Sequence, residues 1–176
     1  MKEHLIEQLL HLRPGLDLRI WGTQWAEYCR SLLVRRHTNP PLRGLAYVKA
    51  LRATRINLGI MGVRPDAKDE TSTRTYEIPA SGGFMLHERS EEVLGLYREG
   101  KEIECFSSVE ELAKKIDYYL AHDEEREAIA RAGHLRCVPT YSYENRMAEI
   151  LRWHEQHEPR GSRSQHRYGA KWEPGA

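Results

Sequence analysis

Apolar positions along the chain alternate between helical and strand-like spacing. The first helical stripe contains five apolar side chains, at Leu5, Ile6, Leu9, Leu10 and Leu12. The pattern predicts helices over residues 3–12, 24–35, 47–52, 73–80, 91–97, 109–120, 124–136 and 143–157. It predicts strands over residues 16–21, 56–60, 84–86 and 103–106. Ser90 and Ser108 are expected to cap the helices that follow them.

The order of these elements predicts the fold class. Strands and helices alternate from residue 16 to residue 121, which requires a parallel sheet whose connections are covered by helices. We therefore predict an α/β fold: a Rossmann-like parallel sheet with helices on both faces, plus C-terminal helices. Ligands of such a sheet bind at the carboxyl ends of its strands.

We expect this domain to span residues 1–157. The tail at 158–176 is rich in Gly, Pro, Ser and Arg and carries no apolar stripe, so it is predicted to be disordered. Asn39-Pro40-Pro41 is interpreted as a rigid break and residues 63–72 as a loop.

Composition narrows the class of protein. The 176 residues are 40% hydrophobic and 30% charged, as expected for one globular domain with a core, and the sequence has no run of about 20 apolar residues that would span a membrane. The net charge of +1 disfavours a basic nucleic-acid binder. Cys29, Cys105 and Cys137 are odd in number and far apart, which disfavours disulfides and zinc and favours a reduced, cytoplasmic setting.

Polar groups gather at the predicted start of the helix at 73–80. Thr71, Ser72 and Thr73 supply three hydroxyls, and Arg74 adds a cation. The backbone N–H groups at a helix start have no partner within the helix, and the helix dipole is positive there. This combination suits a phosphate or diphosphate.

Two acids bracket this helix start. Asp69 precedes Glu77 by eight positions, and a carboxylate such as that of Glu77 accepts hydrogen bonds from two vicinal ribose hydroxyls. A simpler interpretation competes on composition alone. The hydroxyl residues then only cap the helix, and Arg74 pairs with Asp69 or Glu70, because caps far outnumber phosphate sites.

A family resemblance adds to this interpretation. The sequence from Arg74 to Arg89, RTYEIPASGGFMLHER, resembles the central motif of CgeB/YkvP-type glycosyltransferases, the spore maturation protein family. Three further segments are similar to that family: YREGKEIECFSSVEEL from Tyr97, YYLAHDEEREAIARAG from Tyr118 and TYSYENR from Thr140. WGTQW, from Trp21, resembles the strand and loop that open its donor-binding domain. The resemblance covers about residues 16–153.

The resemblance implies a single C-terminal half of a GT-B glycosyltransferase, the half that binds the nucleotide-sugar donor. It implies that Glu77 binds the donor ribose and that Asp69 stands where relatives place the first acid of a Glu-x7-Glu pair. Because Asp is one methylene shorter than Glu, direct contact between Asp69 and the transferred sugar is in question.

The same resemblance assigns the remaining site residues. It implies that the backbone amides of residues 71–73 hold the donor diphosphate and that Arg74 adds charge near the phosphates. Gly22, with Trp21 and Trp25, would line the mouth of the first strand. A metal is not required, since the helix terminus and Arg74 supply positive charge, and the resemblance assigns no catalytic residue.

The function implied is sugar transfer from a nucleotide sugar to an unidentified acceptor. The 15 residues before the first predicted strand are too few for an acceptor domain. The chain is then interpreted as a truncated gene product, a naturally reduced protein, or one half of a split enzyme whose N-terminal acceptor domain is a partner chain. The alternative is a non-catalytic nucleotide-binding or protein-interaction module with the same fold. His87, after a predicted strand, either contacts a sugar or phosphate or is a surface or cap histidine.

Overall fold

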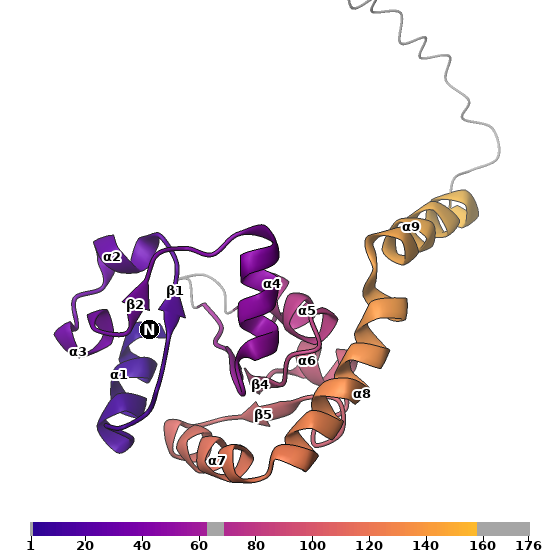
Figure 1. The fold of residues 1–176 in the computed structure, drawn as a ribbon. Coiled ribbons are helices and arrows are strands. Elements are labelled where there is room, and N and C mark those ends of the chain that lie inside the picture. Colours follow the sequence, from indigo (N-terminus) through magenta and orange to yellow (C-terminus); the bar gives the residue numbers. More distant parts are fainter. Residues whose placement is uncertain (1, 63–68, 158–176) are drawn as a thin grey trace, which may run out of the picture. The chain divides into compact units, whose positions relative to one another are not determined.

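The computed structural model describes residues 2–62 and 69–157 of the chain (Figure 1). The chain divides into two compact units, Met1–Ser142 and Tyr143–Ala176, and each is described separately. The tail predicted to be disordered, at 158–176, lies outside the described residues.

The first unit alternates helices and short strands. Its elements are α1 (Lys2–Leu12), β1 (Ile20–Trp21), α2 (Gln24–Tyr28), α3 (Leu32–Arg35), β2 (Thr38–Asn39), α4 (Gly44–Ala53), β3 (Asn57–Gly59), α5 (Thr73–Ala80), β4 (Met85–Glu88), α6 (Glu91–Leu96), β5 (Glu104–Phe106), α7 (Val109–Ala121) and α8 (Asp123–Tyr141). The predicted bounds of α5 are confirmed at both ends. The two predicted serine caps are also confirmed, because Ser90 Oγ accepts from the Val93 amide at 3.2 Å and Ser108 Oγ accepts from the Glu111 amide at 3.1 Å.

The strands in the described ranges form two separate parallel sheets. β3, β4 and β5 make a three-stranded sheet in that order, in which His87 lies between Gly59 and Cys105. β1 pairs with β2 instead of joining that sheet. The predicted α/β, Rossmann-like class with parallel strands is confirmed, whereas the expectation of one continuous sheet is wrong. Pro40, which lacks an N–H, follows β2, so the predicted break marks the end of a strand.

The predicted helix at 24–35 is in fact two helices. α2 ends at Tyr28, and the Glu3 carboxylate of α1 accepts hydrogen bonds from the freed amides of Arg30 and Ser31 at 2.8 and 2.5 Å. Ser31 then caps α3 through the Val34 amide. A carboxylate 27 positions earlier in the chain therefore stabilises a break that local periodicity does not reveal.

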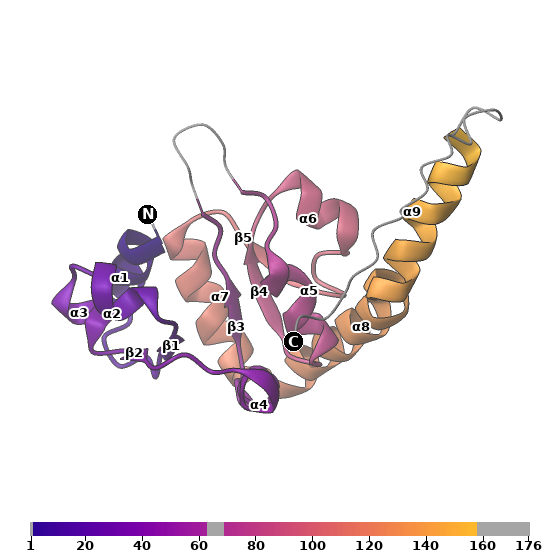
Figure 2. The same cartoon turned by 90° about the horizontal axis from the view of Figure 1, so that it is seen from above.

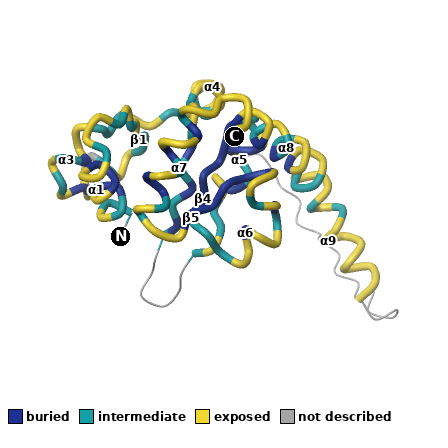
Figure 3. The backbone as a smooth tube through the Cα atoms, turned by 90° about the horizontal axis from the view of Figure 1, so that it is seen from below, coloured by how far each residue is buried: buried dark blue, intermediate teal, exposed yellow. Residues whose placement is uncertain are grey.

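Helices cover both faces of the main sheet because alternate strand residues point to opposite sides. Leu86 and Phe106 face a cluster built with α7, whereas Met85 and Cys105 face a cluster built with α5 and α6. α8 contributes to both clusters (Figures 1 and 2). β4 and β5 are drawn largely in the colour of buried residues in Figure 3.

A third cluster holds the N-terminal elements together. Ile6 and Leu10 of α1 pack with Ile20, Cys29 and Val34. Leu9, on the neighbouring position of the same helix, belongs to the cluster under the main sheet. α1 therefore joins the small β1–β2 sheet to the larger one. None of the three cysteines, all within the described ranges, forms a disulfide, and each is buried.

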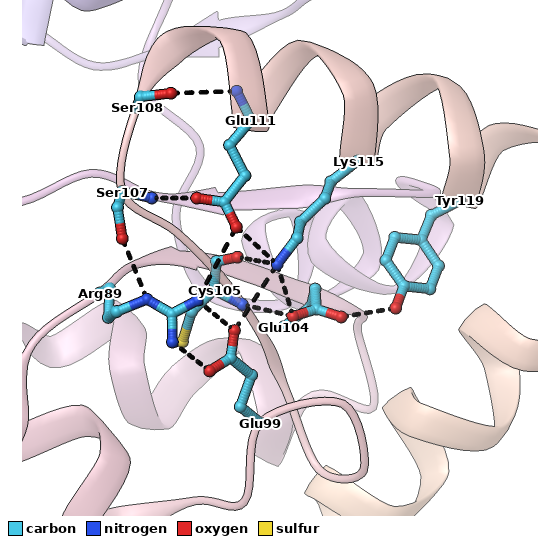
Figure 4. A network of polar contacts seen from close by, with 9 residues as sticks. All are labelled: Arg89, Glu99, Glu104, Cys105, Ser107, Ser108, Glu111, Lys115 and Tyr119. Carbon is cyan, nitrogen blue, oxygen red and sulfur yellow. Dashed lines mark hydrogen bonds and ion pairs between the residues drawn. The ribbon is translucent and has the colours of Figure 1, made fainter.

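A charged network lies along the outer edge of β5 (Figure 4). Lys115 Nζ donates to the Cys105 carbonyl at 2.6 Å and to carboxylate oxygens of Glu104 and Glu111, each at 3.0 Å. Tyr119 donates its hydroxyl to the other Glu104 oxygen at 2.6 Å. Burial alone would raise the pKa of Glu104, but the hydrogen bonds from Tyr119 and Lys115 outweigh burial and lower it.

The second unit contains α9 (Tyr143–His157). Its large apolar side chains are exposed, at Tyr143, Met147, Ile150, Leu151 and Trp153. The tube of α9 is drawn mostly in the colour of exposed residues (Figure 3). Among the helices within residues 2–62 and 69–157, we find none whose length and apolar character would let it cross a bilayer.

Candidate functional site

The first turn of α5 presents unoccupied hydrogen-bonding groups. Ser72 is the N-cap, with extended backbone, and its amide donates to the Thr75 hydroxyl at 3.0 Å. Within the described residues, nothing accepts from the amides of Thr73 and Arg74. Ser72 and Thr75 form a capping box, and Ser72 Oγ is buried within it. Unsatisfied groups at a helix start are a ready anion site.

Arg74 stands beside a second cation that the sequence did not indicate. Its side chain is exposed and has no ion-pair or hydrogen-bond partner among the residues described, so the predicted pairing with Asp69 or Glu70 is absent there. Lys2 of α1 lies nearby. Burial lowers the pKa of the Lys2 ammonium, and the positive charge of Arg74 lowers it further.

Asp69 lies on the Lys2 side of this cation pair. Its amide donates to the Gly62 carbonyl at 3.1 Å, and a methyl group added at Gly62 would come within 2.8 Å of Asp69 Oδ2. The negative charges of Asp69 and Glu88 act on Lys2 by raising its pKa, but they do not outweigh the burial and Arg74. Lys2 therefore lies among one other cation, Arg74, and two carboxylates.

The residues just before the cap are tied to α6. The Glu70 carbonyl accepts from the Ser90 hydroxyl at 2.8 Å, and its carboxylate accepts from the Glu92 amide at 3.3 Å. Thr71, half-buried, follows in the turn. The turn at 69–72 is thus anchored at the start of another helix, which fixes where α5 begins.

Glu77 is exposed on α5 and is held by a tyrosine. The Tyr47 hydroxyl of α4 donates to Glu77 Oε2 at 2.8 Å. Burial, followed by this hydrogen bond, raises the pKa of Tyr47 to about 12, so its hydroxyl remains a donor at neutral pH. Glu77 Oε1 has no hydrogen-bond partner among the described side chains and backbone groups.

A cavity of about 770 Å³ adjoins these groups, which is the size of a site for a small ligand. Its lining includes Arg74, Lys2 and Tyr47, together with Trp21 and Trp25 from the N-terminal elements. Gly22 lies directly behind Trp25. A methyl group at Gly22 would stand 3.1 Å from the indole Cδ1, so glycine lets the ring lie close to the backbone.

His87 is neither at the surface nor in the cavity lining. It is fully buried at the carboxyl end of β4, and its Nε2 lies 3.0 Å from the Thr75 hydroxyl. The expectation of a surface histidine is therefore wrong. Burial lowers the pKa of the His87 imidazole, although Glu88 acts in the opposite direction, so the ring is neutral at pH 7.

Sequence reasoning missed Lys2, Tyr47 and the position of His87. Lys2 and Tyr47 come from helices that precede the site segment by many residues, and neither belongs to a recognisable motif. The only available signal was a lysine and a tyrosine at the ends of amphipathic helices. His87 was found as a candidate because it follows a strand. In the described part of the chain, no group of three or more His, Cys, Asp or Glu side chains is arranged to hold a metal ion.

Comparison with known families places this geometry in context. The model of the glycosyl transferase-like family matches residues 2–152. The chain belongs to the glycosyl transferase-like family. The match includes α1 with Lys2, the α5 start and the cavity between them. A comparison with curated proteins gave no match.

Proposed function

We propose that this glycosyl transferase-like domain binds a nucleotide-sugar donor, with the diphosphate at the start of α5, for transfer of the sugar to a separate acceptor. The observation that carries the proposal is the pair of cations, Lys2 and Arg74, beside open helix-start amides. In finer detail, we propose a CgeB/YkvP-type enzyme whose acceptor domain is supplied by a partner.

The charge arrangement supports a diphosphate. Burial is the main cause of the lowered pKa of Lys2, and repulsion from the neighbouring Arg74 adds to it. An anion between the two cations would relieve this repulsion. The amides of Thr73 and Arg74 can donate to phosphate oxygens. In transfer, negative charge develops on the departing diphosphate, and these same fixed donors would stabilise it.

The neighbouring residues suit the rest of a nucleotide. Glu77 is oriented by Tyr47 and retains an oxygen that can accept from a ribose hydroxyl. Trp25, backed by Gly22, offers an aromatic face in the cavity for a base. Asp69, next to Lys2, is placed to adjust the charge of the phosphate site and not to hold the ribose.

The first test is binding. The full chain is screened by thermal shift against UDP, GDP, ADP and CDP and against UDP-glucose and GDP-mannose. A ligand present at 100 times its dissociation constant stabilises a protein by about 2.7 kcal/mol, which is readily detected. If no compound raises the melting temperature at millimolar concentration, the donor-binding proposal is wrong.

Two matched variant pairs assign the site. Glu77→Gln should weaken binding by about 1.5–3 kcal/mol, the range for a hydrogen bond to a charged group. Glu127→Gln, an exposed acid on α8, is its control and should leave affinity unchanged. Arg74→Ala should likewise weaken binding, whereas Arg131→Ala, on the exposed side of α8, should not. If Glu77→Gln and Glu127→Gln have equal effects on affinity, Glu77 does not belong to the site. Equal effects of Arg74→Ala and Arg131→Ala exclude Arg74 in the same way.

An assay of sugar transfer distinguishes an enzyme from a non-catalytic binding module. We expect little sugar transfer by the purified chain alone, because orientation of donor and acceptor accounts for roughly 7–11 kcal/mol of such a barrier. Adding a candidate acceptor-domain chain should restore donor consumption. Donor binding without transfer under any pairing would favour the binding module, and robust transfer by the chain alone would overturn the need for a partner.

A further inference from the structure

A buried chain of hydrogen bonds runs from the start of α5 into the sheet. The Ser72 amide donates to Thr75 Oγ1 at 3.0 Å, and Thr75 Oγ1 lies 3.0 Å from His87 Nε2. His87 Nδ1 in turn lies 2.6 Å from the Glu88 carbonyl oxygen. Thr75 and His87 are both fully buried, so each member of this chain depends on the others for its hydrogen bonds.

The partners fix the direction of every hydrogen bond. The Glu88 carbonyl can only accept, so Nδ1 of His87 carries the ring proton. In a neutral ring Nε2 then has a lone pair and must accept from the Thr75 hydroxyl. The Thr75 oxygen is thereby turned with a lone pair toward the Ser72 amide. The whole chain is satisfied when His87 is neutral and in this tautomer.

The His87 ring has little freedom to leave this arrangement. On β3, the backbone of Gly59 lies against it, and a methyl group at Gly59 would stand 2.3 Å from His87 Cδ2. On the α6 side, the Tyr97 hydroxyl donates to the Thr75 carbonyl at 3.1 Å. Contacts from β3 and from Tyr97 thus fix the positions of the His87 ring and of Thr75.

We propose that neutral His87 is a positioning residue for the donor site: through Thr75 it holds the Ser72 cap so that the amides of Thr73 and Arg74 stay open to a diphosphate. This role rests on the proposed donor binding. His87 does not touch the ligand. It acts because the Ser72 amide is already occupied by Thr75, which sets the orientation of the turn on which the free amides lie.

Protonation of His87 would break this chain of hydrogen bonds. A proton on Nε2 turns that atom into a donor, so the Thr75 hydroxyl loses its acceptor. The titratable groups that face the ring are few. Glu88 is next to it on β4. Cys105 lies opposite on β5, and burial raises the pKa of its thiol to about 12. Tyr97, the residue that follows α6, contacts Thr75. Gly59 on β3 offers no side chain, and α5 presents Thr75.

The test uses the full chain at pH 7.5 with UDP-glucose and GDP-mannose as probes, because their diester phosphates keep a constant charge. His87→Leu and Thr75→Val each remove one link. We expect either change to weaken probe affinity about threefold to tenfold, the equivalent of one lost hydrogen bond. His87→Gln, whose Oε1 can accept in place of Nε2, and Thr75→Ser, which keeps the hydroxyl, should restore most of that loss.

A purely structural role predicts a different result. In that case the Leu and Val variants lower the melting temperature but bind the probes as the wild type does, and this outcome overturns the proposal. Equal losses in the Gln and Leu variants would also overturn it, since the acceptor would then be irrelevant.

Two further measurements do not depend on a ligand. Nitrogen chemical shifts should show the Nδ1–H tautomer of His87, and the Ser72 amide should exchange faster in His87→Leu than in His87→Gln. The opposite tautomer, or equal exchange in both variants, overturns the proposal. If the wild type binds neither probe while these two measurements hold, the donor-binding proposal fails, and the structural effect of His87 on the start of α5 stands.

Discussion

Lys115 is the cation that compensates the buried Glu104 carboxylate. Its ammonium contacts Glu104, Glu111 and one backbone oxygen. Its loss would therefore leave the buried Glu104 carboxylate without a neutralising cation and the Cys105 carbonyl without this donor. We expect Lys115→Met to lower the free energy of unfolding by about 1.5–3 kcal/mol, the range for hydrogen bonds to charged groups. Chemical denaturation measures this change.

Two controls isolate the charge effect. Lys114→Met removes a charge of the same type from an exposed position on the same helix and should change stability little. Adding Glu104→Gln to Lys115→Met should recover part of the loss, since the buried charge is then gone as well. A double variant as unstable as the sum of both single changes would contradict this account.

His87 predicts how stability depends on acid. Burial lowers its pKa in the folded protein, whereas in the unfolded chain the imidazole titrates near its ordinary value of about 6.5. Above that pH both states are neutral and His87 contributes no pH dependence. As the pH falls below about 6.5, the unfolded state binds more protons, so stability should fall by up to about 1.4 kcal/mol per pH unit.

The comparison with a variant isolates this residue among the nine histidines of the chain. Unfolding free energies of the wild type and of His87→Gln are measured from pH 8 to pH 5. The wild type should lose stability more steeply below pH 6.5, because Gln has no titrating group. Parallel curves would show that His87 has the same pKa in both states.

At the scale of elements, α8 packs closely against the turn before β5. A methyl group at Gly133 would stand 2.3 Å from the Glu102 carbonyl oxygen, which belongs to the backbone and cannot turn aside. We therefore expect Gly133→Ala to destabilise the protein by about 1–3 kcal/mol, as overpacking does. Thermal unfolding followed by circular dichroism tests this.

Gly95 provides the matched substitution. It lies inside α6, and an added methyl group would meet nothing within 4 Å. Gly95→Ala should stabilise the protein by up to about 1 kcal/mol through the helix preference of alanine. Opposite signs at the two glycines are expected. Stabilisation at both would mean that backbone preference, and not close packing, governs Gly133.

Some elements were predictable because local signals agree. α5 has a hydroxyl cap before it and two glycines after it, and its predicted bounds match the structure. β1 occupies only the last two residues of the strand predicted over 16–21, and β2, also two residues long, is too short for a two-residue period to be recognised. The break between α2 and α3 depends on Glu3, a contact between distant parts of the chain that no local pattern contains.

At the scale of the whole first unit, the proposed donor site joins elements that are far apart in the chain. The sequence indicated the α5 start and Glu77, but not that Lys2 would lie beside Arg74. It also placed residues 16–21 in the main sheet, whereas β1 and β2 form a separate sheet next to the cavity. Composition shows which groups a segment carries, and the tertiary fold decides which distant groups join them.

This arrangement predicts a role for the N-terminal elements in binding. Trp25 lines the cavity from α2, so Trp25→Ala should weaken nucleotide-sugar affinity by about 1–3 kcal/mol if the ring stacks on the base. Trp153→Ala, on an exposed helix of the second unit, is the control. Calorimetric titration of both variants measures the difference, and equal affinities would exclude stacking on Trp25.

The side chains around Cys105 also bear on self-association. β5 is the last strand of its sheet within the described ranges, and such an edge can recruit a strand from another molecule. Here the Cys105 amide donates to Glu104 Oε1 at 3.0 Å and its carbonyl accepts from Lys115 (Figure 4). A neighbouring chain therefore finds these two backbone groups already paired. The charges that stabilise this edge of the fold thereby also protect it against edge-to-edge aggregation.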